Sequence, residues 1–168
     1  QMLENWTWDK QVLDSFAADY RDPTKKIPPE ILGQLKAAKY ATYGSHYRRQ
    51  LSFGLMDLYL HTQITAANAT NAIPLANATL SATFLPAPED TALIAYLGHF
   101  TGYDAGYYGY AWADAIAADM ATVFESAPDG YYDQQVGRRL REEIYSKGNS
   151  RDANISIEKF LGRPRSVE

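Results

Sequence analysis

Apolar side chains recur at three- and four-residue intervals along most of the chain, which is the pattern of amphipathic helices. The strongest repeat covers residues 46–62, where polar side chains separate five apolar or aromatic positions: Tyr47, Leu51, Leu55, Leu58 and Tyr59. Residues 110–125 show a helical pattern rich in alanine. Both segments are therefore predicted to be long helices.

Side chains that favour helix starts mark shorter helices. These are residues 9–20 capped by Asp9, a helix beginning at Pro28-Pro29, residues 133–145 capped by Asp133, and residues 150–161 capped by Ser150. A further short helix is predicted over residues 89–97. No segment shows a strand pattern, so the predicted fold class is all-α, with residues 1–168 forming a single helical region.

Residues 64–88 break the helical pattern. Alanine, asparagine and threonine dominate this stretch, and Pro74, Pro86 and Pro88 interrupt it. Such a composition is typical of a long irregular connection, with one helical turn expected near Leu80.

Composition narrows the function without naming it. The 16 lysines and arginines against 20 aspartates and glutamates give a net charge of −4, which disfavours nucleic acid as the partner. No cysteine is present, so thiol catalysis, disulfides and cysteine-bound zinc are excluded. The apolar runs are too short to span a bilayer, and we expect no membrane partner.

The most unusual segment is residues 98–110, with the sequence GHFTGYDAGYYGY. Its four glycines would each cost up to about 1 kcal/mol in a helix, which predicts a loop with unusual backbone angles and a hinge that closes over a peptide. A tyrosine keeps its proton at neutral pH and can donate to an oxygen that becomes negative during acyl transfer.

The spacing of the loop's tyrosines supports two interpretations. Tyr103, Tyr107 and Tyr110 lie at i, i+4 and i+7, so they share a face if the segment coils helically. The alternative is that they pack at a helix start with their hydroxyls at the surface. His99, the histidine of this loop, fits either a hydrogen-bonded structural role or catalysis.

A second pair of polar residues, Asp57 and His61, lies one helical turn apart. This spacing could support a metal, but no further histidine completes a site, so a helix-surface ion pair is expected. The loop thus offers hydrogen-bond donors, while a metal, a nucleophile and a general base are missing.

Three ordered stretches resemble the C-terminal part of the thimet oligopeptidase and neurolysin family of zinc metallopeptidases, which includes oligopeptidase A and peptidyl-dipeptidase. They are residues 1–6 (QMLENW), residues 98–110 with Trp112, and residues 148–153 (GNSRDA) continuing to residues 160–163 (FLGR). Residues 49–51 with Asp57 and His61 also fit the family's long helix. The resemblance covers nearly the whole chain.

The resemblance implies a largely helical peptidase with a deep channel and a single zinc, held by an HExxH motif and a later glutamate. By motif position, Tyr110 is implied as the oxyanion donor and Tyr107 as its assistant. His99 and Tyr103 would hold the substrate backbone, with Gly102 and Gly106 in the same substrate-binding loop. This sequence departs from the family in one respect: the family often has one more glycine before the position of Tyr103.

The sequence begins after the point where the family's zinc ligands and general base would lie. We therefore expect a C-terminal fragment of a zinc metalloendopeptidase, inactive alone, with zinc bound only in the full-length enzyme. Its expected partners are short peptides and the missing N-terminal portion of the same enzyme, and its expected location is the cytoplasm or the mitochondrion. The alternative is a non-catalytic helical peptide-binding module.

Overall fold

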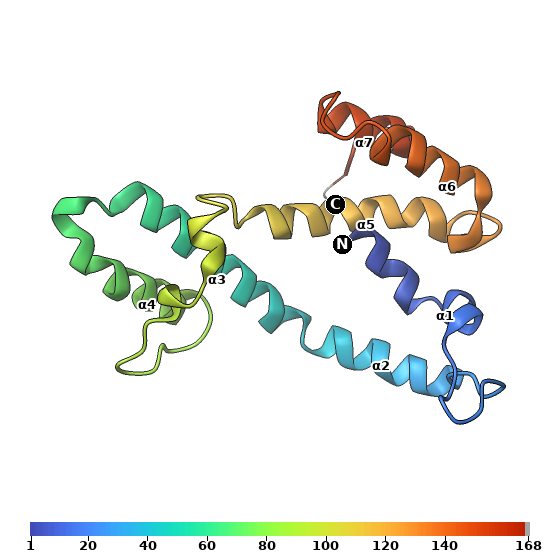
Figure 1. Cartoon of the computed structure of the whole chain (residues 1–168), viewed down its shortest axis with the longest axis horizontal. Coiled ribbons are helices and arrows are strands. Elements are labelled where there is room, and N and C mark those ends of the chain that lie inside the picture. Colours follow the sequence, from blue (N-terminus) through green and yellow to red (C-terminus); the bar gives the residue numbers. More distant parts are fainter. Residues whose placement is uncertain (167–168) are drawn as a thin grey trace. The chain divides into compact units, whose positions relative to one another are not determined.

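The computed structural model describes residues 1–166 and is built from helices joined by turns (Figure 1). The α-helices are α1 (Lys10–Phe16), α2 (Pro29–Ala41), α3 (Tyr43–Gln63), α4 (Ala72–Thr83), α5 (Gly109–Glu125), α6 (Gln134–Leu140) and α7 (Ala153–Leu161). Short 3-10 helices span Met2–Trp8, Ala66–Asn71, Leu93–Ala95, Gly98–Thr101 and Gly130–Tyr132, and a π-helical turn spans Arg141–Tyr145. Within residues 1–166 the sole β-type pairing is an isolated bridge between Asp19 and Asp22, which confirms the all-α prediction.

The two long helices predicted from periodicity are present as α3 and α5, and α2 begins at the predicted proline pair. Asp9 and Asp133 cap α1 and α6 as predicted, their carboxylates accepting hydrogen bonds from amides of the first turn. None of the helices in the described part of the chain has both the length and the apolar character needed to cross a membrane.

The predicted irregular connection over residues 64–88 is wrong in its central part, which forms α4. Pro74 lies in the first turn of α4, where its missing N–H needs no helical partner. Ala76, Thr79 and Leu80 are buried, and α4 packs against α3. Tertiary packing thus outweighs a composition that favours no helix by itself.

Three predicted helix boundaries also differ from the structure. The first helix stops at Phe16, and in the turns that follow the Asp19 and Asp22 carboxylates accept nearby backbone amides, which replaces the helical pattern. The helix predicted over residues 89–97 is reduced to the single turn Leu93–Ala95. The last helix is capped by Asp152, not by Ser150.

The described residues divide into two compact units, each with its own core. Unit 1 comprises residues 1–37 with residues 113–168, and its core is formed by Met120, Phe124, Leu140, Ile157, Phe160 and Leu161. Near it, the Trp6 ring packs edge-on against Phe124 with 4.7 Å between ring centroids.

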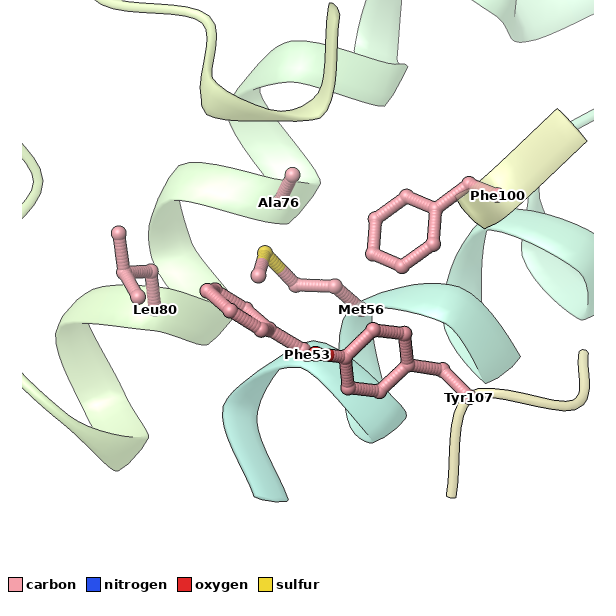
Figure 2. Packing of buried hydrophobic residues seen from close by; sticks show 6 residues of the cluster. All are labelled: Phe53, Met56, Ala76, Leu80, Phe100 and Tyr107. Atoms are coloured by element: carbon pink, nitrogen blue, oxygen red, sulfur yellow. The ribbon is translucent and has the colours of Figure 1, made fainter. Parts of the chain in front are cut away.

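Unit 2 comprises residues 38–112, and its core is formed by Phe53, Met56, Ala76, Leu80, Phe100 and Tyr107. Figure 2 shows these side chains converging between α3, α4 and the segment that follows α4. The whole tyrosine-rich loop lies in this unit, so the candidate site can be described within unit 2 alone.

Candidate functional site

The tyrosine loop, residues 98–110, is a succession of hydrogen-bonded turns. The Tyr103 amide donates to the His99 carbonyl at 2.8 Å, and the Gly106 amide donates to the Tyr103 carbonyl at 2.8 Å. The Gly109 amide then donates to the Gly106 carbonyl at 3.0 Å, directly before α5 begins. The segment therefore has a defined path although much of it lies outside regular helices.

This path brings four of the predicted site residues together. His99 Nε2 lies 3.2 Å from the Tyr110 hydroxyl oxygen, within hydrogen-bonding distance. The His99 ring centroid is 5.9, 5.6 and 5.8 Å from those of Tyr103, Tyr107 and Tyr110, respectively. The tyrosines thus gather around one histidine, although Tyr103 and Tyr107 are not part of a continuous helix.

The three tyrosines differ in their access to solvent. Tyr103 is 67% exposed and Tyr110 is 44% exposed, whereas Tyr107 is only 9% exposed. The Tyr107 hydroxyl donates to Gln50 Oε1 at 3.1 Å, and burial together with the nearby Tyr110 raises its pKa above the ordinary value. Tyr110 and Tyr103 are therefore accessible from solvent, while Tyr107 lies within the protein.

None of the four glycines of the tyrosine loop adopts the left-handed conformation, and Gly102, with φ of −140° and ψ of −17°, lies outside the regular helical and extended regions. Each has a negative φ, and the left-handed conformation falls instead on Ala105, with φ of 53°. Gly106 is needed for close packing, because a Cβ there would lie 3.0 Å from the Tyr103 carbonyl oxygen. A Cβ on Gly102 would meet nothing within 4 Å, so the surface there is open.

One face of α3 supports the loop, starting at the Tyr107 side chain. The Gln50 side-chain oxygen accepts a hydrogen bond from the Tyr107 hydroxyl, and the Phe53 ring packs edge-on against the Tyr107 ring with 5.6 Å between centroids. A Cβ on Gly54 would lie only 3.5 Å from the Cα of Tyr108, so the loop backbone runs directly against the helix.

The same face continues to Asp57, which is completely buried. Its Oδ1 accepts the Ala105 amide at 3.1 Å, and its Oδ2 accepts the Tyr107 amide at 2.9 Å. His61 Nδ1 lies 3.0 Å from Asp57 Oδ1, so the predicted pair exists. Its predicted place on the helix surface is wrong, because Asp57 faces the loop.

Sequence reasoning missed the roles of Gln50 and Asp57. Their signal was polar residues at positions i and i+7 around Phe53 at i+3, which places all three on one helix face. The apolar face predicted for the helix over residues 46–62 is not the face that α3 buries. Leu51 is 55% exposed, whereas the buried residues of α3 are Ser52, Phe53, Gly54, Met56 and Asp57.

The described residues do not fit a catalytic zinc ion. Within residues 1–166 no three histidine, aspartate or glutamate side chains are grouped closely enough to hold a metal. Both oxygens of Asp57 already accept amide hydrogen bonds.

The sequence profile of Peptidase family M3 matches residues 1–168, the whole chain. The chain belongs to peptidase family M3. Its relatives include the thimet-like oligopeptidase of Dictyostelium discoideum, 32% identical over 165 residues that cover 96% of this chain and 24% of the relative. Oligopeptidase A of Escherichia coli K12 is 31% identical over 171 residues, covering 100% of this chain and 25% of the relative.

Saccharolysin of Saccharomyces cerevisiae is 32% identical over 181 residues, covering 100% of this chain and 24% of the relative. These M3 relatives confirm the resemblance noted in the sequence. The chain spans about a quarter of the length of the curated relatives it matches.

Proposed function

We propose that this chain forms part of an M3 oligopeptidase that hydrolyses short peptides, and that it supplies a substrate-binding wall and an oxyanion donor. The observation that carries this proposal is the contact between His99 Nε2 and the hydroxyl oxygen of the half-exposed Tyr110, 3.2 Å apart, with two further tyrosine rings beside the same histidine. Family membership supports the reaction class, and the geometry of the tyrosine loop supports the residue roles.

Tyr110 is the proposed catalytic residue of this chain. During peptide hydrolysis the carbonyl oxygen of the scissile bond becomes negative, and a phenol that retains its proton can donate a hydrogen bond to it. In the tautomer with a proton on His99 Nε2, this N–H donates to the Tyr110 oxygen, and the Tyr110 hydroxyl can donate its own proton to the oxyanion. His99 therefore orients the donor as well as contacting the peptide.

The other loop residues support substrate binding. Tyr103 is well exposed beside His99 and is proposed to hold the peptide backbone. The open surface at Gly102 lets a peptide approach the loop backbone, while Gly106 keeps the turn compact. Tyr107 assists Tyr110 through ring contact, with 5.1 Å between the two centroids.

In this proposal the zinc ion, its ligands and the general base come from parts of the enzyme outside this chain. The zinc would supply Lewis-acid chemistry when bound. The described residues do not fit a zinc site, so its ligands would come from elsewhere in the enzyme. The chain alone is accordingly proposed to be inactive, and its partner is the remainder of the same enzyme.

The first test replaces Tyr110 by phenylalanine in the longer enzyme that carries this sequence. Loss of one oxyanion donor is expected to lower kcat about 10²- to 10³-fold with little change in KM. Tyr96→Phe is the matched control, because Tyr96 is 90% exposed and is not one of the tyrosines around His99. Wild-type turnover by Tyr110→Phe would show that this hydroxyl does not stabilise the oxyanion.

Titration of the isolated 168-residue chain with short peptides tests the alternative of a non-catalytic binding module. A severed half-site is expected to bind them weakly, because the opposite wall of the site is missing. Tight binding that needs no other part of the enzyme would favour the module.

A further inference from the structure

The Asp57 carboxylate of unit 2 has no exposed surface. A buried carboxylate is costly unless hydrogen bonds replace its water. Here the replacements are two backbone amides of the tyrosine loop, from Ala105 and Tyr107, and the ring of His61. The charge is therefore satisfied chiefly when the loop is in place.

His61 fixes the orientation of this carboxylate. Its Nδ1 lies 2.8 Å from the Asp57 backbone carbonyl as well as 3.0 Å from Oδ1, and a carbonyl oxygen can only accept. Nδ1 therefore carries a proton that donates to this carbonyl, and the same N–H lies close enough to attract Oδ1. On its other side, His61 Nε2 faces Asp104 Oδ1 of the tyrosine loop at 3.9 Å.

The two amides held by Asp57 flank Gly106, where the loop needs support. Ala105 adopts a left-handed backbone, which is unfavourable for a residue with a Cβ. Such a conformation persists only where its surroundings fix it. Hydrogen bonds on both sides of Gly106 provide that constraint and carry it to Tyr107, whose ring contacts Tyr110.

We propose that Asp57 is the positioning residue of the tyrosine loop, with His61 orienting its carboxylate. The tyrosine loop is then a clamped segment, held against α3, and not the free glycine hinge that its composition indicates. The consequence for catalysis rests on the function proposed for Tyr110, whereas the effect on the loop can be measured without any substrate.

The decisive variant is Asp57→Asn in the 168-residue chain, followed by amide hydrogen exchange measured by NMR. The Nδ1–H of His61 favours the asparagine oxygen at the Oδ1 position, which leaves the asparagine NH₂ facing the Tyr107 amide. Exchange at Tyr107 is expected to become about tenfold faster or more, with a smaller change at Ala105. The Phe84 amide, which donates within unit 2 to the Leu80 carbonyl at 2.9 Å, is the internal reference and should not change.

A milder variant, His61→Ala, covers the case in which Asp57→Asn does not fold. His61 is partly exposed, and its loss frees the carboxylate to turn, so the Ala105 amide on Oδ1 should exchange faster while Phe84 again stays unchanged. Glu89→Gln removes an exposed charge of unit 2 and should alter none of these amides. Unchanged exchange at both Ala105 and Tyr107 in the two variants, or an equal increase at Phe84, overturns the proposal.

Turnover separates positioning from simple stabilisation in the longer enzyme. We expect Asp57→Asn to lower kcat per active molecule about 10- to 100-fold, because a misplaced donor loses transition-state stabilisation. The number of active molecules is measured by titration with a tight-binding inhibitor. A merely stabilising residue would reduce the number of active molecules and leave turnover per molecule unchanged. Failure of Tyr110→Phe to lose activity would refute the oxyanion role alone, since the exchange experiment does not depend on it.

Discussion

Tyr107 combines structural and electronic roles in a single side chain. Its ring is part of the unit 2 core, and its hydroxyl donates to Gln50. Burial of the hydroxyl and the neighbouring Tyr110 raise its pKa, while the positive charge of Arg49 opposes the shift. The folded state therefore holds the Tyr107 proton more tightly than the unfolded chain does.

This shift predicts how stability responds to alkali. A raised folded-state pKa gives stability that is fully present below the ordinary tyrosine pKa of 10.0 and is lost as the pH rises through the raised value. Tyr107→Phe should lose about 0.5–1.5 kcal/mol at neutral pH with its hydrogen bond, yet show a shallower decline above pH 10. Urea unfolding across that range measures both effects. Parallel declines in the two proteins would contradict the argument, with Tyr96→Phe as the exposed control.

At the same scale, the residues of the tyrosine loop were predictable from sequence, and their support was not. His99, Tyr103, Tyr107 and Tyr110 lie within twelve residues, so local spacing suffices to propose a cluster. Asp57 lies 48 and 50 positions from the two amides that it holds, and no local periodicity reports such a contact. A buried aspartate on α3 was therefore interpreted as half of a surface pair.

At the scale of elements, helix interiors were easier to predict than helix ends. The periodicity of α3 and α5 is long enough to identify both, whereas α4 exists because it buries Ala76, Thr79 and Leu80 as it packs on α3. The start of α7 shows a competition between two candidate caps, Ser150 and Asp152. The Asp152 carboxylate accepts the Asn154 amide at 2.8 Å and the Ile155 amide at 3.4 Å, which identifies it as the cap.

These caps supply a paired test. Asp152→Ala is expected to lower the free energy of unfolding by about 1 kcal/mol, because it leaves first-turn amides of α7 without their acceptor. Ser150→Ala should have nearly no effect, since its side chain is not the cap. Denaturant midpoints of the two variants make the comparison. Equal losses would mean that Asp152 does not cap α7 in solution.

At the scale of the whole molecule, the chain has large apolar side chains at its surface. Phe16 is 67% exposed, and Ile31 and Leu35 on α2 are 45% and 49% exposed. Such side chains support the proposal that the remainder of the enzyme is the partner of this chain. The structure has two compact units, and the single helical region over residues 1–168 stays a prediction.

Within unit 1, Asp119 on α5 binds Arg163 and Ser166, and its negative charge makes stability sensitive to acid. Asp119 accepts hydrogen bonds from the Arg163 guanidinium and from the Ser166 amide at 3.0 Å. The Arg163 hydrogen bond is the main cause that lowers the pKa of Asp119. A lowered folded-state pKa gives stability that is present above the ordinary value of 3.8 and lost as the pH falls through the lowered one.

Arg163→Gln should therefore reduce the acid-induced loss of stability, because the pKa of Asp119 returns toward its ordinary value. Arg138→Gln removes the same charge from an exposed position of α6 and serves as the control. Thermal unfolding between pH 2 and pH 6, at about 0.1 M salt, records the slopes. A slope for Arg163→Gln as steep as that of the control would show that this ion pair does not contribute to acid sensitivity.

The contacts between α3 and the tyrosine loop also restrict the number of residues in this part of α3. Gln50 and His61 stand at the two ends of the support for the tyrosine loop, eleven residues apart, which a helix spreads over about 16 Å. The spacing of these residues along α3 therefore has to match the positions of the groups that they contact in a loop distant in sequence. One inserted residue between Gln50 and Asp57 would turn Asp57 by about 100° around the axis relative to Gln50 and carry it away from its amides. Insertions and deletions among M3 relatives should therefore be rare within residues 50–61 and more frequent in segments that support no distant loop.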